Sequence, residues 1–184
     1  MATDLQFPLM ERRLIVWLSA IAVAIVVATD ILYITIINSQ GPSNMPYIPR
    51  FVGGYLGVMA AVIAVALWPR AEIVIVRVPL RAAAAGGLFV LGFVAAFSIG
   101  PPLVLAAFLV TLALTRTERA PRTQTARLSG LLAAALSVAV LFVGLEVTQR
   151  LIVCPDQGTS AGGGSGLLTG PYQYECVNGR LRYH

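Results

Sequence analysis

Two carboxylates inside apolar stretches are the residues best placed to do chemistry. Asp30 interrupts the apolar stretch 14–37, and Glu146 stands one residue before the end of the apolar stretch 128–147. A charge at mid-membrane costs about 2.5–3.5 kcal/mol on insertion scales, so such a group normally faces other helices and finds a partner there. Tyr33 follows Asp30 by three residues, on the same helical face, where its hydroxyl can share a hydrogen bond with the carboxylate.

Each carboxylate has a functional and a structural interpretation. Asp30 is either a proton- or cation-handling group or ligand counter-charge, or one half of an ion pair with Arg50 or Arg150 at the outer surface. Glu146 precedes Arg150 by four residues, the spacing of a helical ion pair, which favours a structural role. The two carboxylates fall at similar depth, so a site that uses both is geometrically possible.

Cys154 and Cys176 are the only cysteines, and they bracket a glycine-rich segment. In an oxidising compartment we expect them to form a disulfide. The pattern Tyr-x-Tyr-x-Cys-Val, then Asn-Gly, then Leu-x-Tyr predicts a β-hairpin with a two-residue turn, the alternative being a disordered tail. The glycine run at 162–164 predicts a flexible excursion between two fixed points.

The usual catalytic signatures are missing from the sequence. The one histidine is His184, no Cys-x-x-Cys occurs, and the chain has no lysine for a phosphate-binding loop. We therefore expect no catalytic, metal or cofactor site and no enzyme. The arginines are spread between apolar stretches, which argues against nucleic acid as a partner.

Composition places the chain among membrane proteins. It is 58% hydrophobic and 11% charged, against about 25% charged residues in soluble domains. We expect an all-α integral membrane protein with a cytoplasmic N-terminus (1–13), a helical bundle (14–147) and a small extracytoplasmic, disulfide-closed tail (148–184). Apolar runs long enough to approach the span of about 30 Å of hydrocarbon predict about five transmembrane helices, at 14–37, 51–68, 82–99, 103–115 and 128–147.

The stretch 82–115 leaves the number of crossings open. It predicts two crossings joined at Gly100-Pro101-Pro102, one long kinked helix, or a crossing followed by a re-entrant segment. Cytoplasmic loops carry the excess of arginine, and four spans separate the arginines less clearly than five. Five spans put nine of the 13 on the inner side: Arg12, Arg13, Arg70, Arg77, Arg81, Arg116, Arg119, Arg122 and Arg127. Use of arginine without lysine suggests a GC-rich bacterial genome, hence a bacterial plasma membrane.

Two further segments have alternative interpretations. The residues after Arg12-Arg13 pass Val26-Val27-Ala28, an acceptable signal-peptidase site, but the apolar stretch continues through Ile34. We therefore expect an uncleaved first helix. The β-branched segment 72–78 predicts a short interfacial strand or, preferably, an extended connector on the lipid headgroups.

Small residues line two of the predicted spans. Gly53 and Gly57 form a Gly-x-x-x-Gly motif in the second span, and Ala82–Ala85 with Gly86-Gly87 opens the third. Small residues let helix backbones approach closely in lipid. Besides the lipid bilayer, we expect other membrane subunits or further copies of the chain as partners.

The segment Met45-Pro-Tyr-Ile-Pro-Arg-Phe51 lies between the first two predicted spans. In this layout the chain resembles the small membrane subunit of tripartite tricarboxylate transporters, which has an outer loop rich in Gly, Pro and aromatic residues at this place. The resemblance covers one loop and the order of helices, and the cysteine-closed tail departs from the pattern. It implies a membrane subunit of a transporter.

These features lead to two expectations about function. The first is an accessory or structural subunit of a larger bacterial membrane complex, with helices packed on partners and the outer tail docking or capping. The alternative is a small membrane subunit of a transporter, in which Asp30 is a proton-, ion- or substrate-linked carboxylate.

Overall fold

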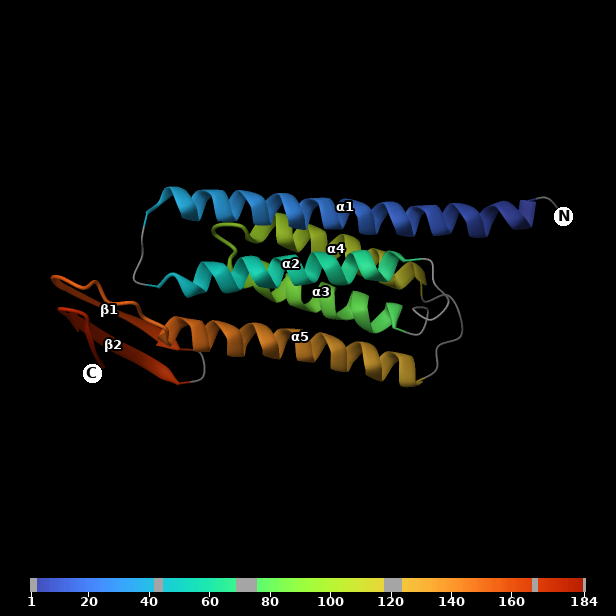
Figure 1. Cartoon of the computed structure of the whole chain (residues 1–184). Coiled ribbons are helices and arrows are strands. Elements are labelled where there is room, and N and C mark those ends of the chain that lie inside the picture. The colour runs from blue at the N-terminus through green and yellow to red at the C-terminus, as the bar shows by residue number, and fades with distance from the viewer. Residues whose placement is uncertain (1–2, 42–44, 69–75, 118–123, 167–168, 184) are drawn as a thin grey trace.

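The computed structural model describes residues 3–41, 45–68, 76–117, 124–166 and 169–183. Within these ranges the chain forms five helices followed by three strands (Figure 1). The helices run alternately in opposite directions, and the strands lie at the end of the bundle where α1 and α5 finish. The elements are α1 Thr3–Ser39, α2 Tyr47–Leu67, α3 Arg77–Val94, α4 Gly100–Thr117, α5 Gln124–Arg150, β1 Thr159–Gly166, β2 Gly170–Val177 and β3 Arg180–Tyr183.

Four of the described helices are long and apolar enough to cross a membrane. They are Arg13–Ser39, Tyr47–Leu67, Arg77–Val94 and Arg127–Arg150, while Gly100–Arg116 is a shorter apolar helix. Large apolar side chains also face outward, such as Leu131 and Leu132, each 69% exposed. An apolar exterior of this kind is suited to lipid rather than water. The fold is therefore mostly helical and consistent with a membrane protein.

The stretch 82–115 forms two helices that pack side by side, so the single kinked helix is wrong. The break also lies earlier than Gly100-Pro101-Pro102. The turn between the helices occupies residues 95–99, and Gly100, Pro101 and Pro102 form the first turn of α4. Proline is tolerated there because first-turn N–H groups have no partner within the helix. At the crossing, a methyl group added to Gly92 would stand 2.9 Å from a Val104 methyl carbon, so the helices meet closely.

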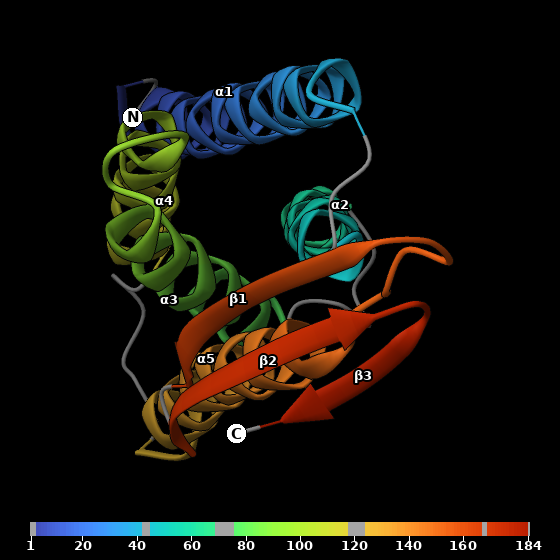
Figure 2. The same ribbon diagram turned by 90° about the vertical axis from the view of Figure 1, so that its left-hand side faces the viewer.

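The helices are arranged around α3 and α2. α3 packs against α4, α5 and α2, while α1 packs against α4 and α2. α1 and α5 lie on opposite sides of α2 (Figure 2). The residues buried at the centre are mainly aliphatic, and the largest fully buried side chains include Leu56, Ile63, Leu88, Leu103 and Leu141.

The three strands form an antiparallel sheet in the order β1-β2-β3, so the fold is not all-α in its tail. β2 and β3 form the predicted hairpin, with φ of 46° at Asn178 and 77° at Gly179. Positive φ at both turn residues is characteristic of the two-residue type I′ turn. Most of the segment 72–78, predicted as an interfacial strand or an extended connector, lies outside the described ranges, and Arg77 and Val78 belong to α3.

The glycine run is a strand, which corrects the expectation of a flexible excursion. Gly162 pairs with Tyr174, and Gly164 pairs with Tyr172, directly across the strands. A methyl group at Gly162 would lie 2.6 Å from the Tyr174 hydroxyl oxygen, and one at Gly164 2.9 Å from that of Tyr172. The tyrosine rings thus occupy the space above the glycines, and this packing compensates for their lack of side chains.

The predicted disulfide is present. Cys154 and Cys176 are bonded, with their Cα atoms 5.5 Å apart. Cys176 is fully buried. The bond ties the chain just after α5 to the middle strand of the sheet.

A hydroxyl pair in the bundle interior joins α2 to α5 beside a glycine of α3. The Tyr55 hydroxyl donates to the Ser137 carbonyl oxygen at 3.1 Å and lies 2.8 Å from the Ser137 hydroxyl oxygen. A methyl group at Gly87 would collide with both side-chain oxygens. Gly87 therefore sets the distance at which the three helices can pack.

We predict that Gly87→Ala destabilises the bundle by about 1–3 kcal/mol, because overpacking forces neighbouring groups apart. Thermal unfolding in mild detergent measures the effect. Gly57→Ala is the matched control, since nothing lies within 4 Å of the position of its added methyl group. Equal midpoints for the two variants would contradict this account of the packing.

Candidate functional site

A cavity of about 600 Å³ lies between the end of α1 and the start of α2, at the same end of the bundle as the sheet. Its size is within the range of small-molecule pockets. Its walls combine apolar residues with three polar ones, Tyr33, Asn38 and Arg50. The full lining consists of Tyr33, Ile34, Ile37, Asn38, Gly41, Pro46, Pro49, Arg50, Gly53 and Gly54.

Asp30 lies beside this cavity, one helical turn before Tyr33 and Ile34. Its Oδ1 is 3.2 Å from the position of a methyl group on Gly53, which itself lines the cavity. Gly53 therefore allows α2 to pass close to the carboxylate. Oδ1 is buried and has no hydrogen-bond partner within the described chain.

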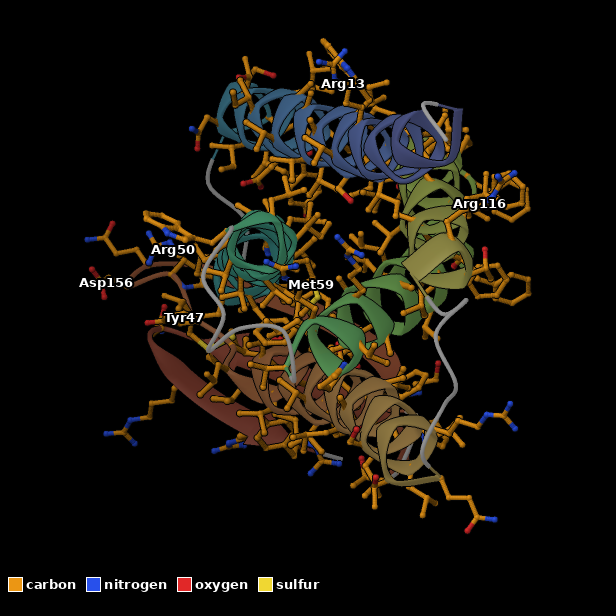
Figure 3. The ribbon with its side chains drawn as sticks, turned by 90° about the vertical axis from the view of Figure 1, so that its right-hand side faces the viewer. Arg13, Tyr47, Arg50, Met59, Arg116 and Asp156 are labelled. Atoms are coloured by element: carbon orange, nitrogen blue, oxygen red, sulfur yellow. A yellow bond between two sulfur atoms is a disulfide. The ribbon has the colours of Figure 1, made fainter. Side chains whose placement is uncertain are left out.

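The structure does not give Asp30 the partners that its sequence context suggests. The Tyr33 side chain lines the cavity, and its hydroxyl does not bond to Oδ1. The Arg50 guanidinium carbon lies 5.8 Å from the centre of the Tyr47 ring, a cation–π geometry. Both side chains point away from the bundle (Figure 3). Arg150 lies instead beside Glu146, with Nε 3.8 Å from Oε1.

Glu146 is at the junction between α5 and the sheet. It is only 8% exposed and accepts a hydrogen bond from the Thr169 hydroxyl. Gly166 stands beside it, and a methyl group there would collide with the carboxylate. Glu146 is thus held between its own helix and the tail, in the structural role that its spacing to Arg150 favours.

Two tyrosines of the sheet cap the C-terminal end of α5. The Tyr172 hydroxyl donates to the Gln149 carbonyl oxygen at 3.0 Å. The Tyr183 hydroxyl donates to the Arg150 carbonyl oxygen at 2.9 Å. The last carbonyl groups of a helix have no partner within the helix, so these bonds cap it. Burial raises the pKa of the Tyr172 hydroxyl above its ordinary value, and a tyrosine hydroxyl is a donor at neutral pH even without this shift.

Asp30 and Glu146 do not form a common site, because α1 and α5 lie on opposite sides of α2. Among the described residues, no three His, Cys, Asp or Glu side chains lie close enough to hold a metal ion. His184 is outside the described ranges.

The sequence interpretation missed several residues that matter in the structure. Tyr172 and Tyr183 were interpreted only as strand residues, although tyrosines near a helix end are a usable signal for capping. Thr169 gave no signal. Arg81 was counted as a loop charge, but it belongs to α3 and is 4% exposed; the alanine and glycine run directly after it indicates a helix.

The Gly-x-x-x-Gly motif divides between two surfaces. Gly53 packs against α1, where the position of its added methyl group is 3.5 Å from Ile34 side-chain atoms. Gly57 faces outward and has open space around it. Among the described residues, therefore, Gly53 serves packing between helices of this chain and Gly57 does not.

Comparison with known proteins gives no relatives: no family model, no curated protein and no solved structure matches this chain. The likeness to the small subunit of tripartite tricarboxylate transporters consequently depends on the segment 45–51, most of which is not a loop but the start of α2, and on the order of helices alone.

Proposed function

We propose that the protein is a small, non-enzymatic subunit of a bacterial membrane transport assembly. In this proposal the outer cavity gives a proton, a cation or a small solute access to Asp30. The observation that carries the proposal is the buried Oδ1 of Asp30, which has no hydrogen-bond partner in the described chain and lies beside a cavity.

The comparison with Glu146 supports a functional role for Asp30. Both carboxylates belong to apolar helices, where a charge is costly and requires compensation. Glu146 has this compensation from Thr169 and Arg150. The buried Oδ1 of Asp30 has no such group among the described residues, yet it lies next to a space large enough for a ligand. A carboxylate in that position can take up a proton or a cation.

The proposed topology has five crossings, with the N-terminus in the cytoplasm and the tail outside a bacterial plasma membrane. α4 has 18 residues, about 27 Å at 1.5 Å per residue, close to the thickness of the hydrocarbon layer. In this topology the alternating helix directions put the sheet outside, and the disulfide supports the proposal because such bonds persist in oxidising compartments.

We predict that, after reduction, a membrane-impermeant thiol reagent added to intact cells labels Cys154, which is half-buried, more readily than Cys176, which is fully buried. Labelling that requires cell lysis would overturn the topology. The Cys154→Ser, Cys176→Ser variant, which must remain unlabelled, controls for other sites of reaction.

We predict that dicyclohexylcarbodiimide modifies Asp30 in purified protein, because this reagent reacts with protonated carboxyl groups in apolar surroundings. Modification, measured by peptide mass spectrometry, decreases as pH rises and is absent in Asp30→Asn. Gly54→Trp narrows the cavity and slows modification several-fold. Gly57→Trp is the matched control, because Gly57 is also exposed but does not line the cavity. Equal modification rates in the two tryptophan variants would contradict access through the cavity.

A second candidate function is that of an accessory or structural subunit without a ligand. The observation in its favour is an outward face of small residues on α2, formed by Gly54, Gly57, Ala61 and Ala64. Faces of this kind let another helix approach closely in a membrane. The tail favours docking less, because its tyrosines and Thr169 bond to the chain's own α5.

We predict that tagged protein extracted in mild detergent carries partner subunits with it, and that Ala61→Leu reduces their recovery. Ala135→Leu, the same change on an exposed position of α5, leaves recovery unchanged. Purification from native membranes as a lone monomer would overturn the subunit proposal. If Ala61→Leu keeps all partners, they do not bind at the α2 face.

A further inference from the structure

A second cavity, of about 350 Å³, lies at the opposite end of the bundle from the sheet. Three helices contribute to its lining: Val78 and Ala82 from α3, Leu114 from α4, and Arg127, Gly130 and Leu131 from α5. Arg127 is its only charged lining residue within the described chain. The cavity is thus an apolar groove with a single cation.

The groove follows from the way that α4 and α5 flank α3. α3 packs extensively against both neighbours. α3 and α5 lie close together at Gly86, where an added methyl group would stand 3.1 Å from the Ala134 Cβ. About one turn nearer the arginine-rich end of the bundle, a methyl group added to Gly130 would stand 3.6 Å from the Ala82 Cβ. Side chains this small leave the groove unfilled.

The end of the bundle that holds this groove carries most of the positive charge. The described arginines there are Arg13, Arg77, Arg81, Arg116 and Arg127. Arg127 is exposed at the start of the candidate membrane span of α5, so it stands at the level where lipid headgroups begin. Leu131 lies one helical turn further into the span, is 69% exposed, and forms part of the rim.

We infer that this groove binds an anionic phospholipid, with an acyl chain along its apolar wall and the phosphate at Arg127. The apolar lining matches a hydrocarbon chain. A cation at the mouth of a groove between helices favours an anionic headgroup over a zwitterionic one. The inference involves neither Asp30 nor the outer cavity, so it holds or fails independently of the proposed function.

Native mass spectrometry of the purified full-length chain tests this binding. The protein in mild detergent is mixed with phosphatidylglycerol or with phosphatidylcholine of the same acyl chains, and the retained lipid is counted. We expect the first lipid to bind about fivefold more tightly, as one arginine near a membrane surface contributes roughly 1 kcal/mol toward anionic lipid. Equal retention of the two lipids would overturn the inference.

Arginine variants distinguish a specific lipid site at Arg127 from a general attraction between the basic end of the bundle and anionic lipid. Arg127→Gln removes the preference for phosphatidylglycerol, and Arg127→Lys keeps most of it. Arg116→Gln is the matched control: Arg116 belongs to the same end of the bundle but projects from the outer side of α4 (Figure 3), so its loss leaves the preference unchanged. An equal effect of Arg116→Gln and Arg127→Gln would overturn the site.

The apolar part of the groove has its own test. Leu131→Trp fills the rim from an exposed position and is expected to reduce retention of both lipids. The hydrophobic core is not altered by this change, and an unchanged thermal midpoint in lipid-free detergent verifies that the fold persists. Full retention of phosphatidylglycerol by a folded Leu131→Trp variant would show that the lipid binds elsewhere.

Discussion

Polar atoms inside an apolar helical bundle must find partners within the chain, because hydrocarbon supplies none. Most of this architecture follows that constraint. Several threonine hydroxyls donate hydrogen bonds to carbonyl groups of their own helices, namely those of Thr29, Thr111 and Thr148. Tyr55 and Ser137 satisfy each other across two helices, and Gly87 leaves the space for them to do so. At the end of α5, the tail supplies hydroxyl groups to Glu146 and to the last carbonyl groups.

Asp30 departs from this pattern, as does Ser19, whose buried hydroxyl oxygen also has no hydrogen-bond partner within the described chain. The proposed function centres on Asp30 because it is a carboxylate and lies beside a cavity. A structural carboxylate at such a depth would resemble Glu146, with donors on two sides. The neighbourhood of Asp30 contains instead a glycine that allows α2 to pass close by, and this glycine also lines a cavity. Under the proposed function, the energetic cost of the carboxylate is offset by a ligand that enters the cavity, or by a proton.

The sequence was sufficient for features that depend on local pattern. Long apolar runs predicted the helices, and the Asn-Gly pair predicted the hairpin turn, because each is set by a few neighbouring residues. Cys154 and Cys176 were paired by elimination, as the only two cysteines. The helix break was misplaced because Pro101 and Pro102 mark a helix start as readily as an end, and the direction depends on what precedes them.

Features that depend on distant contacts were beyond the sequence. Nothing near Glu146 in the chain indicates that Thr169 will reach it. Arg50 and Arg150 were plausible partners for Asp30 by depth, but depth does not say on which side of a helix a side chain lies. The glycine run carried no strand propensity of its own. Its order depends on rings contributed from the strand opposite.

The tyrosine-covered glycine strand has a consequence for how the sheet selects its register. A strand of Thr-Ser-Ala-Gly-Gly-Gly-Ser-Gly has almost no alternation of large and small side chains, and such strands slide easily past a partner. Slippage is opposed here at the end of the β1–β2 pair away from its connecting turn. There the Asn178 backbone N–H donates to the Gly158 carbonyl oxygen, and the Gly158 N–H donates to the Asn178 side-chain oxygen. The disulfide between Cys154 and Cys176 fixes the same end covalently. It therefore helps to set the register of β1 against β2, and with it which glycine lies opposite which tyrosine.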